Sequence, residues 1–585
     1  MNRAIIEEDL RNRAKHYSPQ THLEVNYYRI RRRLAYPLPV RKLLLPELPV
    51  PGIPVYPWAT WMLWALEERV HSLGWAAEWS GDSALQDLVL RDLKALAGWP
   101  SFRQYENPDL SLGHSCRLLW LALKRWEWAG VLRPDIALAF ERVLEENAHC
   151  WDPAKGGPDT AEAILRLAPS ERGLANIPLI GTTGLALAAH TVGHHASEFL
   201  DRRLRAVLGA TLELRRTGHA EGVAYDGYIL DFVAHWLEEI PEEDRNPILD
   251  HPEFAGMLDE SIHLAAPGNL SNVARIGDVE PEEMPFHLSA HAKLLRLRPS
   301  ARSVWLLNRC MPGRLRADAL GEFHSHVDGA VESAPEAAPA DAGYALSLRS
   351  GWEEQDLCAV VSASSSPMGH LPLDGGTLVI GTCGRWLLDD PGYQQYMQKT
   401  ERVFTLGPKA HNAPLLNGQA QNRRFAFRDF DLEDSGKGCF RASVNLLHGY
   451  PEDLQLELAR RTVWLCERDL IVVADQIRGV GVREMDYCWH GHPEAAWWVA
   501  DNRARLYFPE ATLWISSPQT LINGTCLDRL PGSRGHLTLQ AAVEKPLPAA
   551  VWWVFSLGAE PPAIRLSDDG QALQCSGSCF EVHGK

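Results

Sequence analysis

The sequence predicts two structural halves, a helical N-terminal domain followed by an antiparallel β-sandwich. Three observations predict this fold class: helical periodicity over residues 57–325, a linker-like segment over 329–343, and short β-branched runs after it. With 585 residues, of which 45% are hydrophobic, the chain is long enough to bury more than one core. We therefore expect a helical domain over 1–328, a linker over 329–343 and a sandwich over 344–585.

The helical half is predicted from apolar residues spaced three and four apart. The first such stripe follows Pro57, a residue that the first turn of a helix tolerates, and continues to Leu73. We find no repeat of fixed length, but serial helical hairpins over this length are typical of a closed ring or a solenoid. Further helices are predicted over residues 112–128, 136–150, 183–196, 199–216 and 229–237.

The pattern changes after the segment 329–343, which is rich in Ala, Pro and Glu and has no hydrophobic period. Short apolar runs bounded by turn residues then follow without intervening helices. Such evenly spaced strands predict an antiparallel sandwich or barrel. The predicted strands are 358–362, 378–382, 463–466, 471–474, 506–508, 513–515, 537–539 and 551–555.

Composition excludes several classes of partner. The chain has 58 basic and 75 acidic residues, and its net charge of −17 argues against a nucleic-acid-binding face or a polybasic membrane patch. Neither a signal-peptide core nor a membrane-spanning apolar run is present. Eleven cysteines, with close spacing only at Cys575 and Cys579, indicate no disulfide framework, and we expect most of them to be buried thiols. We expect a cytoplasmic protein, or a periplasmic one if a leader had been trimmed.

Several motifs follow one another at the start of the predicted sandwich. They are LRSGW with Arg349 and Trp352, then Gly369 and His370, Asp374 and Gly375, the Asp390-Pro391-Gly392 turn with Tyr396, and finally Ala410-His411-Asn412. Together they resemble the heparinase II/III-like family of polysaccharide lyases, which carries these elements in the same order.

The helical half adds three matches to the same family. They are Asn176 in ANIPLIGTTG, the pair Glu221 and Gly222 with Tyr225 in AEGVAYDGY, and Asp278 in ARIGD. The resemblance covers residues 170–495. It implies an (α/α) toroid, which is an incomplete helical barrel, before the sandwich. It also implies cleavage of a uronic-acid-containing glycan, sulfated or not, by β-elimination to unsaturated uronate products.

The resemblance assigns the catalytic roles to Asn176, Tyr225 and His370. In β-elimination the proton beside a uronate carboxylate is removed while the glycosidic oxygen leaves, so the enzyme must stabilise an enediolate. Asn176 would donate to the carboxylate, although Asn also caps helices well. Tyr225 would be the acid, and its neutral phenol needs no activation for that role. His370 would be the base or would tune the tyrosine.

Other residues compete for these roles. Tyr228, three residues after Tyr225, is the rival phenol, and His219 is a less favoured histidine. His190 and His194 have metal-ligand spacing, but no acidic residue completes an HExxH pattern.

The resemblance also suggests substrate-binding residues and a metal site. Some family members hold a structural zinc with a second His two residues after the catalytic one, but Pro372 occupies that place here. Asp390 and His411 alone make an incomplete site, so we expect no required cofactor and regard structural zinc as doubtful. His490 or His492 would be the substitute ligands. The predicted substrate-binding residues are Glu221, Arg349, Tyr396, His411 and Asn412.

The predicted partner is an anionic polysaccharide or oligosaccharide, with no nucleic acid and no membrane. Three other functions stay open: a uronate C5-epimerase, a non-catalytic carbohydrate-binding protein, and a glycoside hydrolase that would use two carboxylates among Glu221, Asp226 and Asp278. The sequence specifies neither the sugar nor the oligomeric state.

Overall fold

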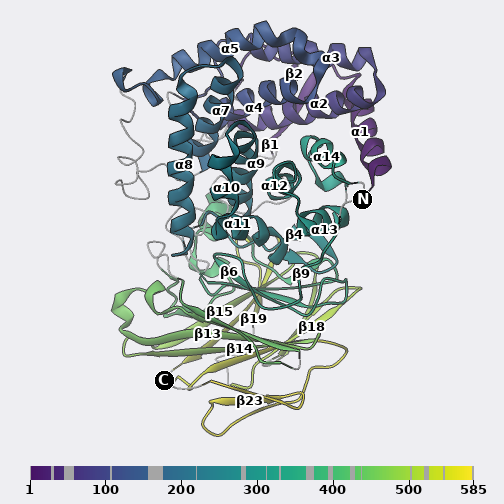
Figure 1. The fold of residues 1–585 in the computed structure, drawn as a ribbon. Helices are drawn as coiled ribbons and strands as arrows, with labels where there is room; N and C mark the ends of the chain where they lie inside the picture. The colour runs from purple at the N-terminus through teal and green to yellow at the C-terminus, as the bar shows by residue number, and fades with distance from the viewer. Residues whose placement is uncertain are drawn as a thin grey trace. The chain divides into compact units, whose positions relative to one another are not determined.

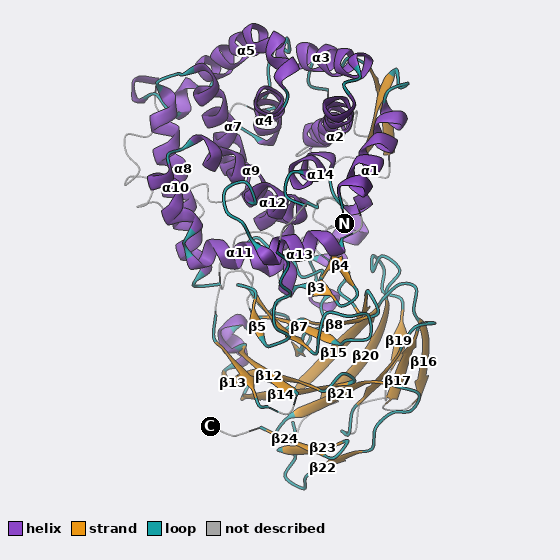
Figure 2. Cartoon of the chain, turned by 45° about the vertical axis from the view of Figure 1, so that its right-hand side comes forward, coloured by secondary structure: helices purple, strands orange, loops and turns teal. Residues whose placement is uncertain are grey.

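The structure is a computed structural model that describes residues 2–27, 32–44, 58–105, 108–155, 176–218, 220–277, 285–310, 312–327, 331–363, 375–392, 399–421, 428–436, 438–500, 503–519, 526–544 and 547–582. Helices make up the N-terminal half, and antiparallel sheets follow it (Figures 1 and 2). The predicted fold class, a helical toroid followed by an antiparallel sandwich, is therefore confirmed. The chain divides into two compact units, each described by itself below.

The helical half consists of two kinds of helix. α4 is buried along almost its whole length, as is α9, whereas α3 and α5 bury one face only. Helices that are apolar all round belong inside a helical layer, and amphipathic ones cover them. The helices are α1 (Arg3–Tyr17), α2 (Trp58–Ser80), α3 (Ser83–Ala97), α4 (Leu110–Arg125), α5 (Arg133–Glu146), α7 (Asn176–Val192), α8 (Ala196–Arg215), α9 (Val223–Glu239), α10 (Glu242–Leu249), α11 (Pro252–His263), α12 (Phe286–Leu294), α13 (Ala301–Arg309) and α14 (Ala317–His324).

The five helices predicted by residue range all form, with shifted ends. Some ends have local causes: the carboxylate of Asp109 accepts from the backbone N–H of Leu112 and begins α4, and Asp82 begins α3 in the same way. α1 precedes the predicted helical stretch 57–325 and was not predicted, nor were two short hairpins, β1 (His22–Tyr27) with β2 (Arg32–Pro37) and β3 (Ala265–Ala266) with β4 (Asn269–Val273). None of the helices in the described ranges has the length and apolarity to cross a membrane.

The sandwich consists of two antiparallel sheets that face each other across an apolar core, which includes Leu348, Ile380, Val463 and Trp553. The first sheet contains β5 (Ala340–Asp341), β6 (Ala345–Arg349), β7 (Cys358–Ser362), β8 (Leu378–Thr382), β9 (Arg385–Leu388), β10 (Leu415–Leu416), β15 (Glu484–Gly491), β19 (Cys526–Asp528) and β20 (Leu537–Glu544). The second contains β11 (Phe430–Asp434), β12 (Cys439–Asn445), β13 (Leu456–Cys466), β14 (Leu470–Gly479), β16 (Ala496–Ala500), β17 (Arg503–Tyr507), β18 (Thr512–Ser516) and β21 (Val551–Leu557). All the predicted strands lie within, or overlap, these elements. A small sheet of β22 (Ile564–Leu566), β23 (Ala572–Cys575) and β24 (Ser578–Glu581) follows, and α15 (Lys399–Thr405) lies earlier in the chain.

The boundaries of the two compact units differ from those predicted. Segments 214–224 and 259–283 of the helical half belong to the same unit as the sandwich. Their apolar residues form one buried cluster with outward-facing residues of the first sheet, as Val223 and Val273 do with Val360. The compact units therefore do not follow a single cut at residue 328, because burial joins segments that are distant in sequence.

The predicted linker is shorter than expected. Residues 331–339 contain no helix or strand, as the linker prediction implied. Ala340 and Asp341, however, form β5 and pair with Ser347 and Leu346 of β6. The sandwich therefore begins inside the predicted linker, where composition alone gives no strand signal.

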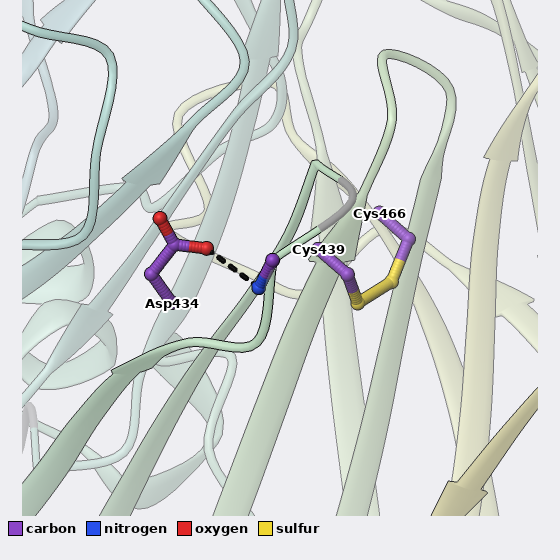
Figure 3. Close-up of a disulfide and its surroundings, with 4 residues drawn as sticks. Asp434, Cys439 and Cys466 are labelled. Carbon is purple, nitrogen blue, oxygen red and sulfur yellow. Dashed lines mark hydrogen bonds between the residues drawn. A yellow bond between two sulfur atoms is a disulfide. The ribbon is translucent and has the colours of Figure 1, made fainter.

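A disulfide joins Cys439, the first residue of β12, to Cys466, the last residue of β13 (Figure 3). The two residues are register partners on neighbouring strands, with their Cα atoms 4.1 Å apart. The expectation of thiols is therefore wrong for this pair, because sheet register brings together residues 27 positions apart.

Candidate active site

The first turn of α9 carries the predicted acid, Tyr225. Gly222, immediately before the helix, has φ +95°, a conformation that glycine adopts without the penalty a side chain would bring. Val223 begins α9, and its N–H donates to the hydroxyl of Tyr344 at 2.9 Å. The Glu-Gly part of the motif thus has a structural reason, because the glycine turns the chain into the helix. Tyr225 retains 7% of its surface, and Glu221 is buried.

One turn further along α9, Tyr228 lies in a buried chain of hydrogen bonds. Its hydroxyl contacts Nε2 of His114 on α4, and Nδ1 of His114 lies 2.8 Å from Oε1 of Glu67 on α2. The indole N–H of Trp64 donates to the same Nε2 at 2.9 Å. Phe286 stacks on the Tyr228 ring at 4.2 Å between centroids. No part of Tyr228 is exposed, so substrate cannot reach this rival phenol.

The charges around these hydrogen bonds determine which atoms donate and which accept. Burial raises the pKa of Glu67, but the charge of Arg117 and the contacts of His114 and Arg316 outweigh it and hold that pKa well below its usual value. Burial lowers the pKa of His114 to about 4. At neutral pH an ionised Glu67 therefore accepts from Nδ1 of a neutral His114, whose Nε2 accepts from the hydroxyl of Tyr228.

Buried ion pairs extend the chain through the helical unit. Arg117 donates to Glu67 at 3.0 Å and also pairs with Asp231 on α9. Lys293 of α12 bridges Asp231 and Asp318 of α14, with its Nζ 2.7 Å from the latter. Arg316 completes the set at 2.9 Å from Glu67, so three cations face three carboxylates. We call these six residues, with His114 and Tyr228, the central polar network.

This network was not predicted from the sequence, although the sequence contains a pattern that is consistent with it. Polar and aromatic residues recur three positions apart on inner helices, at His114 and Arg117 on α4 and at Tyr228 and Asp231 on α9. Such pairs share one helix face. On a helix that is otherwise buried all round, a polar pair requires partners on a neighbouring helix. That inference needs the helix to be known as an inner one, which a single sequence does not reveal.

Asn176 is the first residue of α7 within the described residues, and it is buried. α7 packs closely on α4 through glycines. A Cβ on Gly184 would lie 2.7 Å from the Cα of Gly113, and one on Gly113 would lie 2.6 Å from a side-chain atom of Ile180. α4 therefore contacts α7 on one side and, through His114, α9 on the other. These helices carry Asn176 and Tyr225, respectively.

In the sandwich unit, two predicted motifs meet. Nδ1 of His411 lies 3.0 Å from Oδ2 of Asp390, which directly follows the Asp389 at the end of β9. Asn412 donates from its side-chain amide to the carbonyls of Leu378, at 2.9 Å, and Asp389, at 2.7 Å. Its side-chain oxygen accepts from the N–H of His490 at 2.8 Å. The Asp-Pro-Gly and Ala-His-Asn motifs are thus adjacent.

These contacts correct two substrate-binding predictions. The amide of Asn412 is occupied by sheet backbone, so Asn412 joins strands instead of meeting a sugar. Arg349 is 1% exposed, its Nη2 donates to the carbonyls of His263 and Ala265, both at 2.8 Å, and its guanidinium stacks on Trp352. A buried cation that holds backbone is structural, because a substrate carboxylate could not reach it without unpacking the site.

The residues present do not fit a structural zinc ion. No group of three or more potential ligands occurs within the described ranges. The other carboxylate oxygen of Asp390 accepts from the N–H of Gly392 at 2.8 Å. His490 cannot substitute as a ligand, because its two ring nitrogens contact the carbonyl of Lys409 at 3.0 Å and the hydroxyl of Thr538 at 2.9 Å. We therefore derive no step through a metal.

Several predicted residues lie outside the described residues, namely His370, Tyr396, Asp278, His219 and Pro372. Among the described ones, the structure joins Asp390 to His411 directly. It places Asn176 and Tyr225 on two inner helices that both pack on α4. His190 pairs with Asp201 at 3.0 Å, which agrees with a structural role for that histidine.

Comparison with known proteins adds a likeness of fold. No model of a protein family and no curated protein matches the sequence. The crystal structure of heparinase III superimposes with a TM-score of 0.61 at 12% identity, covering 92% of this chain and 84% of that one. The chain has the fold of heparinase III. The heparan sulfate lyase HepC from Pedobacter heparinus superimposes with a TM-score of 0.55 at 14% identity, covering 98% of this chain and 88% of that one, and a mutant of it gives 0.57 at 13% with the same coverage.

Proposed function

We propose that this chain is a polysaccharide lyase that cleaves a uronic-acid-containing glycan by β-elimination. The observation that carries the proposal is the placement of Tyr225, which lies in the first turn of an inner helix of a fold shared with heparan sulfate lyases. Tyr225 keeps some exposure, whereas the neighbouring Tyr228 has none. Fold alone does not determine activity, so the proposed activity depends on these residues and is tested by their substitution.

Each residue has one role in the proposed reaction. Tyr225 donates a proton to the glycosidic oxygen as the C–O bond breaks. A neutral phenol, whose reference pKa is about 10, is protonated at neutral pH and needs no activation for this step. Asn176 directs its amide N–H to the substrate carboxylate and stabilises the enediolate. His370, which lies outside the described residues, remains the hypothetical base.

The central polar network supports this chemistry indirectly. Its contacts join α2, α4, α9, α12 and α14, and α9 carries Tyr225 in its first turn. Small displacements of a reacting group reduce rates strongly, so a helix held by several buried ion pairs is a suitable base for an acid. The network residues are positioning residues, since each of them is already paired with another member of the network.

The test is the ultraviolet absorbance of an unsaturated uronate. Purified protein would be incubated with heparan sulfate, chondroitin sulfate, hyaluronan and alginate. We expect one of these to give rising absorbance, and we expect Tyr225→Phe to reduce the rate by about 10²- to 10⁴-fold, the range for loss of a general acid. Tyr507→Phe, at an exposed tyrosine of the sandwich, is the matched control and should leave the rate unchanged.

Other outcomes would favour the alternative functions. Proton exchange at the sugar without chain cleavage would indicate a C5-epimerase, and saturated reducing ends would indicate a hydrolase. Absence of any reaction on the whole panel would contradict the proposed activity.

A further inference from the structure

A cavity in the helical unit lies apart from the residues discussed so far. It has a volume of about 340 Å³, within the range of roughly 300–1,000 Å³ typical of ligand sites. Its walls are α1, the C-terminal end of α2 and the start of α3, and Figures 1 and 2 both show α1 beside α2. The polar and aromatic residues that line it are Glu7, Arg11, Lys15, Ser18, Trp79, Ser80 and Asp82. We call it the α1–α2 cavity.

Trp79 provides a supported aromatic surface in this cavity. Its ring stacks on the imidazole of His324, at the end of α14, with centroids 4.0 Å apart and planes inclined by 23°. Nε2 of His324 lies 2.9 Å from a carboxylate oxygen of Glu7. The indole is therefore fixed from one side while it lines the cavity, and a rigid indole is a good surface for the apolar face of a sugar ring.

The cavity is lined by two cations and two carboxylates, which differ in the contacts that they make. Arg11 and Lys15, four residues apart on α1, are exposed, and neither is paired within the part of the chain that the structure describes. The two carboxylates are already engaged, Glu7 with His324 and Asp82 with the N–H groups of Ala84 and Leu85 at the start of α3. Two available cations beside an aromatic ring are unusual on a chain whose net charge is −17.

We propose that the α1–α2 cavity is a secondary binding site for a uronate sugar of an anionic polysaccharide. The sugar ring stacks on Trp79, and its carboxylate pairs with Arg11 and Lys15, the first of which offers a two-pronged donor. The ligand class rests on the proposed function. The site holds a long chain while another part of that chain is cleaved, which raises the effective concentration of polymer without affecting short substrates.

The first test measures binding by the Tyr225→Phe protein, in which cleavage is suppressed. Decasaccharides of heparan sulfate, chondroitin sulfate, hyaluronan and alginate are the probes, with a neutral dextran oligomer for comparison. Hydrogen exchange would be followed in peptides covering α1 and the end of α2. We expect one anionic probe to slow exchange in both peptides at low salt, and we expect dextran to have no effect.

Variants then test the named residues. Two variants are compared, Trp79→Ala and the double variant Arg11→Gln with Lys15→Gln. Each should raise the Kd of the probe, measured from the probe concentration that slows hydrogen exchange, about fivefold to tenfold. The double variant changes only exposed side chains, so it keeps the test valid if Trp79→Ala fails to fold. Arg41→Gln with Lys42→Gln removes the same charge at exposed positions outside the cavity and is the matched control, with less than a twofold change expected.

The outcomes separate this site from the proposed activity. Protection of α1 that the cavity variants abolish supports the site, even if no probe yields an unsaturated product and the lyase proposal fails. Protection elsewhere, with α1 unaffected by all four anionic probes, overturns the site and leaves the lyase proposal standing. Equal weakening by the cavity variants and by the Arg41 and Lys42 control would also overturn it, because binding would then follow only total charge. In a protein that is active, cavity variants should raise KM for polymer and leave kcat on a tetrasaccharide unchanged.

Discussion

At the residue scale, the two tyrosines of α9 show how exposure divides roles between similar side chains. Tyr225 and Tyr228 lie three residues apart on one helix, and sequence alone left them as rivals. The hydroxyl of Tyr228 is consumed by His114 inside the central polar network. A phenol without solvent contact cannot protonate a departing sugar, so the structure favours Tyr225 on accessibility.

This division predicts opposite effects of two conservative substitutions. Tyr228→Phe removes a buried hydrogen bond, although Trp64 still donates to the same His114 nitrogen. We expect its free energy of unfolding to fall by about 1–2 kcal/mol, with elimination retained. Tyr225→Phe should instead lose elimination. Urea denaturation and the absorbance assay on the same preparations check this, and a swapped pattern would make Tyr228 the acid.

At the element scale, glycine-mediated contacts set the spacing of the inner helices. α7 approaches α4 so closely that the Cα of Gly113 occupies the place of a side chain on Gly184. α9 approaches α12 in the same way, since a Cβ on Gly227 would lie 2.5 Å from the Cα of His287. Such close approach fixes where the first residues of α7 and α9 lie, and these helices carry the predicted catalytic Asn176 and Tyr225.

Gly184→Ala should therefore affect both stability and activity. The new methyl group would meet backbone, which cannot rotate away as a side chain can. We expect a loss of about 1–3 kcal/mol in the free energy of unfolding, the usual range for overpacking, and a lower kcat because Asn176 moves with α7. Gly209→Ala on α8 is the control, since nothing lies within 4 Å of its Cβ position. Equal stability of the two variants would refute tight packing of α7 on α4.

At the scale of the whole molecule, neutral buried histidines link stability to pH. Burial lowers the pKa values of His114 and His287 to about 4, and those of His291 and His490 to about 3. Each has an ordinary value of 6.5 in the unfolded chain. Between these values the unfolded chain binds protons that the folded one does not. The contribution of these neutral histidines to the free energy of unfolding should therefore be fully present above pH 6.5 and should fall as the pH drops toward 4.

His287 gives the clearest test, because burial alone lowers its pKa. At pH 5 this histidine should lower the free energy of unfolding by on the order of 2 kcal/mol relative to pH 7.5. Denaturant unfolding of wild type and His287→Leu at both pH values would measure this. We expect a smaller pH effect in the variant by about that amount. His22→Gln, at an exposed histidine, should leave the pH effect as it is in wild type. An unchanged pH effect in His287→Leu would show that this histidine does not stay neutral in the fold.

The sequence by itself determined the fold class and most of its regular elements. Hydrophobic period is a local property, so α4 and α9 were predicted from three- and four-residue spacing, and β7 and β8 were predicted with their observed ends. Motif order located Asp390 and His411 before their contact was seen.

Only the tertiary structure decided which of these residues are available to a ligand. Arg349 and Asn412 look like ligand-binding residues in sequence, but each is occupied by backbone that is distant along the chain. The roles of Glu67 and His114 were not predicted, because they depend on a chain of contacts with Tyr228 that joins residues of three different helices. The disulfide and the division into units have the same cause. Strand register and burial bring together residues that are distant in the sequence, whereas hydrophobic periodicity gives information only about residues that are close in the sequence.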